Sequence, residues 1–285
     1  MSWAEAGVGA VATQSVVEPA YGPRGLGLMR DGQSAPAALH QLLGDDPQES
    51  ARQVAMIDRA GRVAVHTGAR CIAHAGHAVG DQVSAQANIM ARNTVPAAMV
   101  RAYSTAPAMS FGERLVAALD AAEAEGGDLR GRQAAAVLIV SPRATGNPVE
   151  DRPIDLRVED HPDPLGELRR LLSLRRAYQR VDVGDQHAAA GDVHGSLAEY
   201  EAAHRSQPDN LELAFWHGVA LAASGREHDA APILRRAFDA HAGWIELLKR
   251  LPAAGLFPDD GELIARLIGT RTVSEPESTP PPAAL

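Results

Sequence analysis

The sequence is poor in lysine, cysteine and aromatic residues. Lys249 is the single lysine among 27 basic residues, and Cys71 is the single cysteine in 285 residues. One cysteine excludes an intramolecular disulfide. Aromatic residues make up only 4% of the chain, although hydrophobic residues make up 45%. A core of ordinary size is therefore possible, but it must be built from alanine, valine, leucine and isoleucine.

The chain also lacks an excess of positive charge. Its formal net charge is −9, which disfavours a nucleic-acid partner because phosphate binding needs clustered cations. No apolar run is long enough to span a bilayer, and the start has no charged-then-apolar leader. The sequence therefore predicts a cytoplasmic protein with no nucleic-acid and no membrane partner.

Strand and helix patterns alternate in the first half of the chain. Segments with strand composition, bounded by turn residues, are 8–15, 52–58, 62–67, 82–89 and 134–141. The last is a continuous apolar run, which predicts a strand buried on both faces. A helix is predicted over 34–43 with Ser34 as its N-cap, and another over 110–125, where Ser110 and Glu113 have capping-box spacing. This order predicts an α+β fold with helices packed on a sheet.

Many short motifs of this half resemble one bacterial family. They are Pro19 to Leu26, Arg52-Gln53, His66-Thr67-Gly68, Cys71, Ala75-Gly76-His77, Asn88 and Gly127 to Gly131. The chain resembles the family catalogued as domain of unknown function 1028, which is grouped with the N-terminal-nucleophile (Ntn) hydrolases. The resemblance implies an αββα sandwich over residues 1–141. It names no substrate.

The resemblance also bears on the start of the chain. In Ntn hydrolases the first residue of the mature chain is the nucleophile, and its free α-amine is the base. Family members usually carry two more strands upstream, so we expect an N-terminally truncated sandwich that begins roughly thirty residues late and lacks this nucleophile. Ser2, exposed by removal of Met1, is a less favoured substitute. The sheet edge left open would favour self-association, so a homo-oligomer is expected.

The second half is predicted to be helical. Residues 142–152 hold two prolines and are predicted to form a linker, while 271–285 hold four prolines and are predicted to form a disordered tail. Between them, over 153–270, Gly184 matches Gly218 at a spacing of 34 residues, which is typical of tetratricopeptide repeats. This half also resembles a segment that often follows the family domain and is named for peptidoglycan binding. Wall binding is disfavoured because the chain is predicted to be cytoplasmic, and helical repeats more often bind peptides or pack against their own domain.

Five residues are candidates for a catalytic or binding site. Asp128 and Arg130 precede a buried strand, where they would either orient a substrate carboxylate or fix a turn. Asn88 would either stabilise an oxyanion or cap a turn. Arg52, at the head of a strand, has the same two interpretations as Asp128 and Arg130, and His66 ends a strand. Ser15 and Thr67 are hydroxyls at strand ends without a neighbouring base, so neither is favoured as the nucleophile.

No cofactor and no metal are predicted. The metal-like spacing in the sequence joins His66, Cys71, His74 and His77, but it contains no paired Cys-x-x-Cys, so zinc is disfavoured. Two function classes remain open. One is an Ntn-type amidohydrolase acting on a small amide or peptide. The other is a non-enzymatic ligand-binding or scaffold protein that acts through its helical repeats.

Overall fold

The computed structural model describes residues 1–269 and divides the chain into two compact units. The first unit is Met1–Leu172 and the second begins at Ser173. This division lies C-terminal to the linker expected at 142–152. The tail expected at 271–285 lies outside the described residues.

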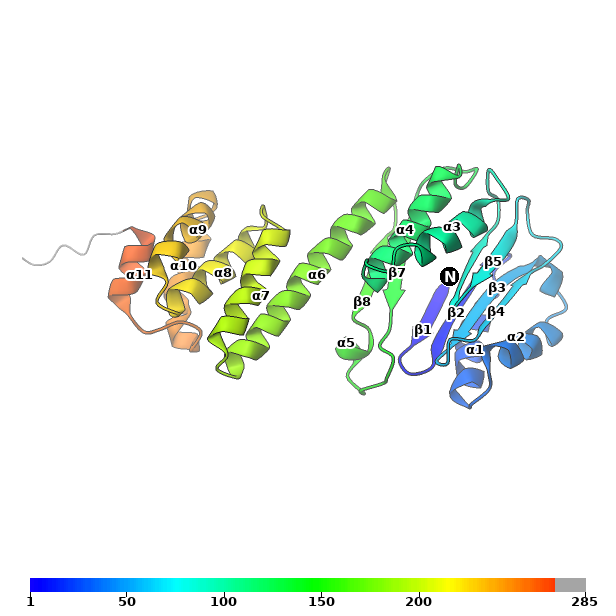
Figure 1. Cartoon of the computed structure of the whole chain (residues 1–285), viewed down its shortest axis with the longest axis horizontal. Coiled ribbons are helices and arrows are strands. Elements are labelled where there is room, and N and C mark those ends of the chain that lie inside the picture. The colour runs from blue at the N-terminus through cyan, green and yellow to red at the C-terminus, as the bar shows by residue number, and fades with distance from the viewer. Residues whose placement is uncertain (270–285) are drawn as a thin grey trace, which may run out of the picture. The chain divides into compact units, whose positions relative to one another are not determined.

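The first unit contains an antiparallel sheet of four strands (Figure 1). In sheet order these are β1 (Ser2–Glu5), β2 (Gly9–Ser15), β3 (Arg52–Asp58) and β4 (Val63–Thr67). Side chains alternate along β3, so Val54 and Met56 lie on one face and Gln53 lies on the other. The two faces are covered by different layers.

Two helices, α1 (Tyr21–Arg30) and α2 (Ala35–Gly44), cover the face of Val54 and Met56. The Ser34 cap of α2 is confirmed, since its hydroxyl accepts a hydrogen bond from Ala37 N at 3.3 Å. Helix α1 was not predicted, because its sequence contains three glycines and a proline. Its glycines permit close packing: a Cβ at Gly22 would lie 2.2 Å from the Trp3 ring.

The other face of the sheet is covered by a second β layer of two short hairpins. One hairpin is β5 (Gly76–Gly80) with β6 (Val83–Ala87), and the other is β7 (Ala135–Ile139) with β8 (Ile154–Val158). β5 and β6 lie against β4 and β3, and β7 lies beside β1. Helix α3 (Val95–Ser104) packs on β5 and β6, and α4 (Phe111–Ala124) packs on β7. The unit is thus an α+β sandwich with the layer order helix, sheet, sheet, helix.

The prediction for the apolar segment 134–141 was right about the strand and wrong about its burial. Val137 packs in a core with α4 residues such as Val116, but the opposite face of β7 carries Ala136, which is exposed. The reason is that helices cover only one face of this hairpin. The capping box that opens α4 is confirmed: Ser110 N donates to Glu113 Oε2 at 2.9 Å, and Glu113 N donates to Ser110 Oγ at 3.4 Å.

The first unit also contains a short helix, α5 (Pro148–Asp151), which precedes β8. The second unit is helical. Helix α6 (Pro164–Ala189) begins in the first unit and continues into the second. The remaining helices are α7 (Val193–Ser206), α8 (Leu211–Ala223), α9 (Glu227–Ala240), α10 (Gly243–Arg250) and α11 (Gly261–Ile268). The bounds of α7 and α9 differ by 34 residues at both ends, which matches the spacing seen in the sequence. Within residues 1–269, no helix has the length and apolarity needed to cross a bilayer.

Candidate ligand-binding site

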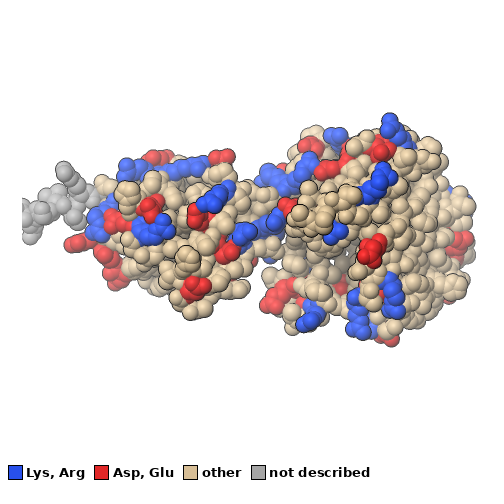
Figure 2. Space-filling view, in the orientation of Figure 1, with Lys and Arg blue, Asp and Glu red and all other residues tan. Residues whose placement is uncertain are grey.

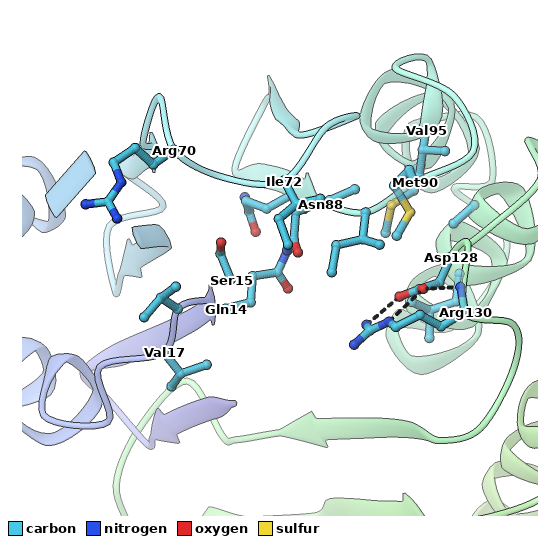
Figure 3. Close-up of a pocket in the computed structure, with 17 residues that line it drawn as sticks. Gln14, Ser15, Val17, Arg70, Ile72, Asn88, Met90, Val95, Asp128 and Arg130 are labelled. Carbon is cyan, nitrogen blue, oxygen red and sulfur yellow. Dashed lines mark hydrogen bonds and ion pairs between the residues drawn. The ribbon is translucent and has the colours of Figure 1, made fainter. Parts of the chain in front are cut away.

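The first unit contains a cavity of about 480 Å³ at the carboxyl end of β2. Its wall is formed by residues 14–17 at the end of β2, Arg70 and Ile72 in the loop after β4, residues 86–90 at the end of β6, side chains of α3 and α4, and the turn that precedes β7. Most of the lining is apolar. Figure 3 shows Gln14, Ser15 and Asn88 near one another, with Asp128 and Arg130 apart from them.

A buried glutamine, Gln53, organises the polar end of this cavity. Gln53 is fully buried on β3. Its Nε2 donates to the carbonyl oxygens of Gly76 and Ala87, each at 3.0 Å, and also lies 3.0 Å from Thr67 Oγ1. Two carbonyl partners fix which end of the carboxamide is nitrogen. The Gln53 Oε1 atom is therefore held toward the cavity.

Gln53 Oε1 accepts two hydrogen bonds from side chains that line the cavity. Gln14 Nε2 donates at 2.7 Å and Asn88 Nδ2 donates at 3.0 Å. Each of these carboxamides uses one of its two N–H donors in this way. Each therefore keeps a second N–H and a carbonyl oxygen. The three carboxamides form a cluster, which we call the carboxamide cluster (Gln14, Gln53 and Asn88).

Two residues beside this cluster have left-handed backbones. Ser15 has φ of 66° and Ile89 has φ of 60°, and neither is glycine. Such conformations cost free energy and often occur at functional sites. Here they end β2 and follow β6, so they turn the chain at the two places where the cluster residues meet the cavity. Ser15 is the one hydroxyl-bearing residue that lines the cavity in the described part of the chain.

Asp128 and Arg130 also line the cavity, and they bind each other. Arg130 Nε and Nη2 donate to the Asp128 carboxylate at 2.9 and 2.6 Å, and Arg130 N donates to Asp128 Oδ1 at 2.8 Å. These hydrogen bonds hold the pKa of Asp128 below its usual range. The pair is local in sequence and stabilises the turn before β7. It also places a compensated ion pair, rather than a single charge, at the wall.

The other two candidates, Arg52 and His66, do not line the cavity. Arg52 is 6% exposed and binds Asp46 at 2.8 Å on the helix-covered side of the sheet, where it lowers the pKa of that carboxyl. His66 Nε2 lies 2.8 Å from the carbonyl oxygen of Glu49. Arg52 reaches the site only indirectly, because its Nη1 donates to the carbonyl oxygen of Val16 at 2.8 Å. The structure thus brings Asn88, Asp128 and Arg130 to one cavity and leaves Arg52 and His66 outside it.

The residues with metal-like spacing have separate partners. Cys71 Sγ donates to the carbonyl oxygen of Arg52 at 3.3 Å, and His77 Nδ1 lies 2.9 Å from Thr67 Oγ1. Within residues 1–269, no group of three or more His, Cys, Asp or Glu side chains is arranged to hold a metal ion. The Thr67–His77 pair does connect to the carboxamide cluster, since Gln53 Nε2 lies 3.0 Å from Thr67 Oγ1.

Gln14 was not identified as a site residue from the sequence, and Gln53 was considered only within the Arg52-Gln53 pair at the head of a strand. The available signal was Gln53 itself, a polar residue between Arg52 and Val54 at the start of an otherwise apolar strand. An uncharged polar side chain that is buried in a strand needs several hydrogen-bond partners. The partners of Gln53 include the side chains that line the cavity.

Comparison with known proteins identifies the family. A model described as "Family of unknown function (DUF1028)" matches residues 1–168. The chain belongs to this family. The match ends close to Leu172, the last residue of the first unit.

One solved relative is protein SPO2555 from Silicibacter pomeroyi, whose crystal structure is described under the same family model. It is 31% identical, with a TM-score of 0.51, over 61% of this chain and 70% of that one. No curated protein matches. The resemblance to this family is therefore confirmed, and a function does not come with it.

Proposed function

We propose that the cavity binds an uncharged amide and that the chain belongs to an amide-hydrolysing system of the Ntn type. The observation that carries this proposal is the carboxamide cluster. Gln14 and Asn88 each present one free N–H and one carbonyl oxygen, held in place through the buried Gln53. An amide group also has one acceptor and N–H donors, so it can satisfy both residues at once.

The surroundings of the cluster favour an uncharged ligand. The cavity wall is mainly apolar, and its acidic group, Asp128, is paired with Arg130. Arg70 also lines the cavity, and Figure 3 shows its guanidinium apart from Gln14 and Asn88. A charged group placed at the carboxamide cluster would lose hydration without gaining an ionic partner. Moving an amide from water into the cavity would cost less free energy, because hydrogen bonds to Gln14 and Asn88 would replace its hydrogen bonds to water.

Hydrolysis is the reaction class supported by the resemblance to Ntn hydrolases. In that chemistry the hydroxyl or thiol of the first residue adds to the amide carbonyl, and its α-amine takes the proton. The second N–H of Asn88 would then stabilise the oxyanion.

The test is an amide-library screen of a chain extended upstream by the two expected strands, with its N-terminal amine either free or blocked by a short further extension. Turnover that needs the free amine, and that persists in Ser15→Ala, is expected. Equal turnover with both forms would remove the N-terminal mechanism. Turnover lost in Ser15→Ala alone would transfer the nucleophilic role to Ser15.

A second candidate function is a non-enzymatic scaffold that binds peptides through tetratricopeptide-like helices. The supporting observation is a hollow of about 330 Å³ in the second unit, lined by Ser173, Arg176, Arg180, Arg205 and Ser206 among others. The arginines are not free charges: Arg180, for example, pairs with Glu199 at 2.8 Å. On the visible face, basic and acidic side chains are interspersed (Figure 2). A silent amide screen, together with peptide binding by the second unit, would favour this alternative.

A further inference from the structure

Two helices of the second unit, α6 and α7, lie side by side (Figure 1) and line the hollow of about 330 Å³. Polar contacts join the two helices. Gln207, the residue after α7, donates through Nε2 to Ser173 Oγ at 2.6 Å, and Arg180 Nη1 donates to Glu199 Oε2 at 2.8 Å. All described residues that line the hollow belong to the second unit. The hollow is therefore a property of this unit alone.

The lining residues occupy one face of each helix. Along both helices they are spaced by three or four residues, which places them in a single stripe. Ala177 is 1% exposed, so it lies at the bottom of the hollow, and the longer polar side chains surround it. The lining consists of two alanines, two serines and three arginines: Ser173, Arg176, Ala177 and Arg180 on α6, and Ala202, Arg205 and Ser206 on α7.

Positive charge dominates this lining. It contains three arginines, and no acidic side chain is among the described residues that line it. Arg180 and Arg205 each pair with a glutamate outside the lining, Glu199 and Glu201 respectively. Each of these pairs engages one nitrogen of the guanidinium, which has five N–H donors in total. Both arginines therefore keep donors for a second acceptor.

The serines and the end of α7 complete the environment. Ser173 Oγ accepts the hydrogen bond from Gln207, so its own O–H remains a donor. The carbonyl groups at a helix C-terminus disfavour an anion. Two of those at the end of α7 are engaged, since Ser206 Oγ donates to the carbonyl oxygen of Ala203 at 2.7 Å and Gln207 N donates to that of His204 at 3.1 Å. The three guanidinium groups thus favour an anionic ligand.

We propose that this hollow binds a peptide with acidic residues at alternate positions. Arg176 and Arg180 are four residues apart, which is about 6 Å along the axis of α6. In an extended peptide, residues i and i+2 point to the same side and lie about 6.6 Å apart. Their carboxylates therefore match the two guanidinium groups, which bind carboxylates in charge-assisted pairs. This inference rests on the second candidate function and names the class of peptide; it uses no property of the cavity in the first unit.

The first experiment measures binding of three acetylated and amidated pentapeptides to the full chain by calorimetry. They are Gly-Glu-Gly-Glu-Gly, Gly-Glu-Glu-Gly-Gly and Gly-Gln-Gly-Gln-Gly, at about 0.15 M salt to screen distant charges. The first should bind saturably. The second, with the same charge at adjacent positions, should bind at least about tenfold more weakly, because its carboxylates point to opposite sides. Equal binding of the first two, or no binding of the first, would overturn the inference.

The second experiment places the peptide in the hollow. Arg176→Gln and Arg180→Gln each remove one charge from an exposed side chain, so the fold should tolerate both changes. Arg235→Gln is the matched control, since Arg235 is exposed on α9 and does not line the hollow. Affinity for Gly-Glu-Gly-Glu-Gly should fall at least about tenfold in the first two variants, each losing a charge-assisted pair, and stay unchanged in the control. Equal affinity in all three variants would overturn the inference.

Two further readouts separate this inference from its rivals. Glutarate, a dicarboxylate without a peptide backbone, should bind at least about tenfold more weakly than the peptide, because it lacks the main-chain groups that add hydrogen bonds. Equal affinity for glutarate would make the hollow a site for small acids and overturn the inference. Binding of the glutamine peptide that persists in both arginine variants would also overturn it, while leaving a peptide-binding scaffold in place. Binding as expected supports the inference whether or not the amide screen shows turnover.

Discussion

At the scale of single residues, the site depends on one buried carboxamide. Gln53 orients Gln14 and Asn88, which face the cavity, and it also binds Thr67 and the carbonyl oxygens at the start of β5 and the end of β6. The hydrogen bonds of Gln53 hold the β5–β6 hairpin against the first sheet, and they also orient the side-chain amides of Gln14 and Asn88.

The substitution Gln53→Leu should therefore lower stability strongly. It keeps a similar size but leaves two buried carbonyl oxygens and several side-chain polar groups without a partner. We expect the free energy of unfolding to fall by about 3 kcal/mol, given the usual cost of unsatisfied buried groups. Urea unfolding followed by circular dichroism measures this. Gln41→Leu, at an exposed position on α2, is the control, and an equal loss in both variants would contradict the role of Gln53.

Part of the site was predictable from the sequence at this scale. Asn88, Asp128 and Arg130 stood out because they follow or precede strands, where side chains meet cavities. Gln14 and Gln53 did not, since an uncharged amide inside a strand gives no sign of which face it points to. For the same reason, the sequence did not show that Arg52 on β3 and His66 on β4 point to the side of the sheet that helices α1 and α2 cover.

At the scale of elements, local sequence predicted α2 and α4, which begin with serine caps, and missed α1 and α3, which begin without a side-chain cap. Ser34 and Ser110 marked α2 and α4, where a side chain satisfies the first free amides. Helix α1 begins without a side-chain cap, and its glycines serve packing against Trp3 and Met56, which only the tertiary structure shows. Burial of β7 was overestimated because an apolar run does not reveal whether both of its faces are covered.

The contact between α8 and α9 should tolerate no side chain at Gly218. A Cβ there would lie 2.7 Å from Cγ of Leu234, which is fully buried. Gly218→Leu should cost about 2–3 kcal/mol of stability, as overpacking does in other cores. Gly261→Leu, where nothing lies within 4 Å of the added Cβ, should cost far less. Chemical unfolding of both variants checks this, and similar losses would contradict the packing argument.

A histidine pair between α7 and α8 should make the second unit sensitive to acid. His204 Nδ1 lies 3.2 Å from His217 Nδ1, and burial lowers the pKa of His217 to about 4. Arg205, Arg226 and Arg236 disfavour a further positive charge in this region, and Glu201 partly offsets them. The folded state therefore binds fewer protons than the unfolded state between the ordinary histidine pKa, about 6.5, and the lowered value.

The contribution of this pair to the free energy of unfolding should be fully present above pH 6.5 and should be lost as the pH falls toward 4. The loss should be roughly 2–3 kcal/mol over this range. Unfolding measured from pH 7 to pH 4 should show a smaller slope in His217→Gln than in the parent protein. His228→Gln, at a fully exposed position, should keep the parent slope. The same slope in all three proteins would exclude the pair as the cause.

At the scale of the whole molecule, each unit has a core of its own. The buried residues of the largest cluster in the second unit run from Phe215 to Leu267, on helices α8 to α11 and the segments between them, and Leu197 of α7 packs against them. The first unit has separate clusters under α1 and α2 and under α4. The sequence indicated this division through its change from strand to helix patterns. The position of the boundary was not predictable, because α6 is one continuous helix across it.

A fragment of residues 173–269 should consequently fold alone. Its core residues all lie within it, so no buried apolar surface should be newly exposed in that cluster. Circular dichroism should show a helical spectrum and a cooperative thermal transition. A spectrum dominated by β signal, or a transition without cooperativity, would contradict the independence of this core.

The most direct test of amide recognition observes the side-chain NH₂ resonances of Gln14 and Asn88 by NMR during titration with a small uncharged amide. Both pairs of resonances should shift and saturate together, with Asn88→Leu weakening the affinity about tenfold, the value expected for one lost hydrogen bond. Gln33, whose amide binds Gln41 at 3.1 Å on an exposed surface, is the internal control and should not shift. Unchanged Gln14 and Asn88 resonances at saturating ligand would contradict the account.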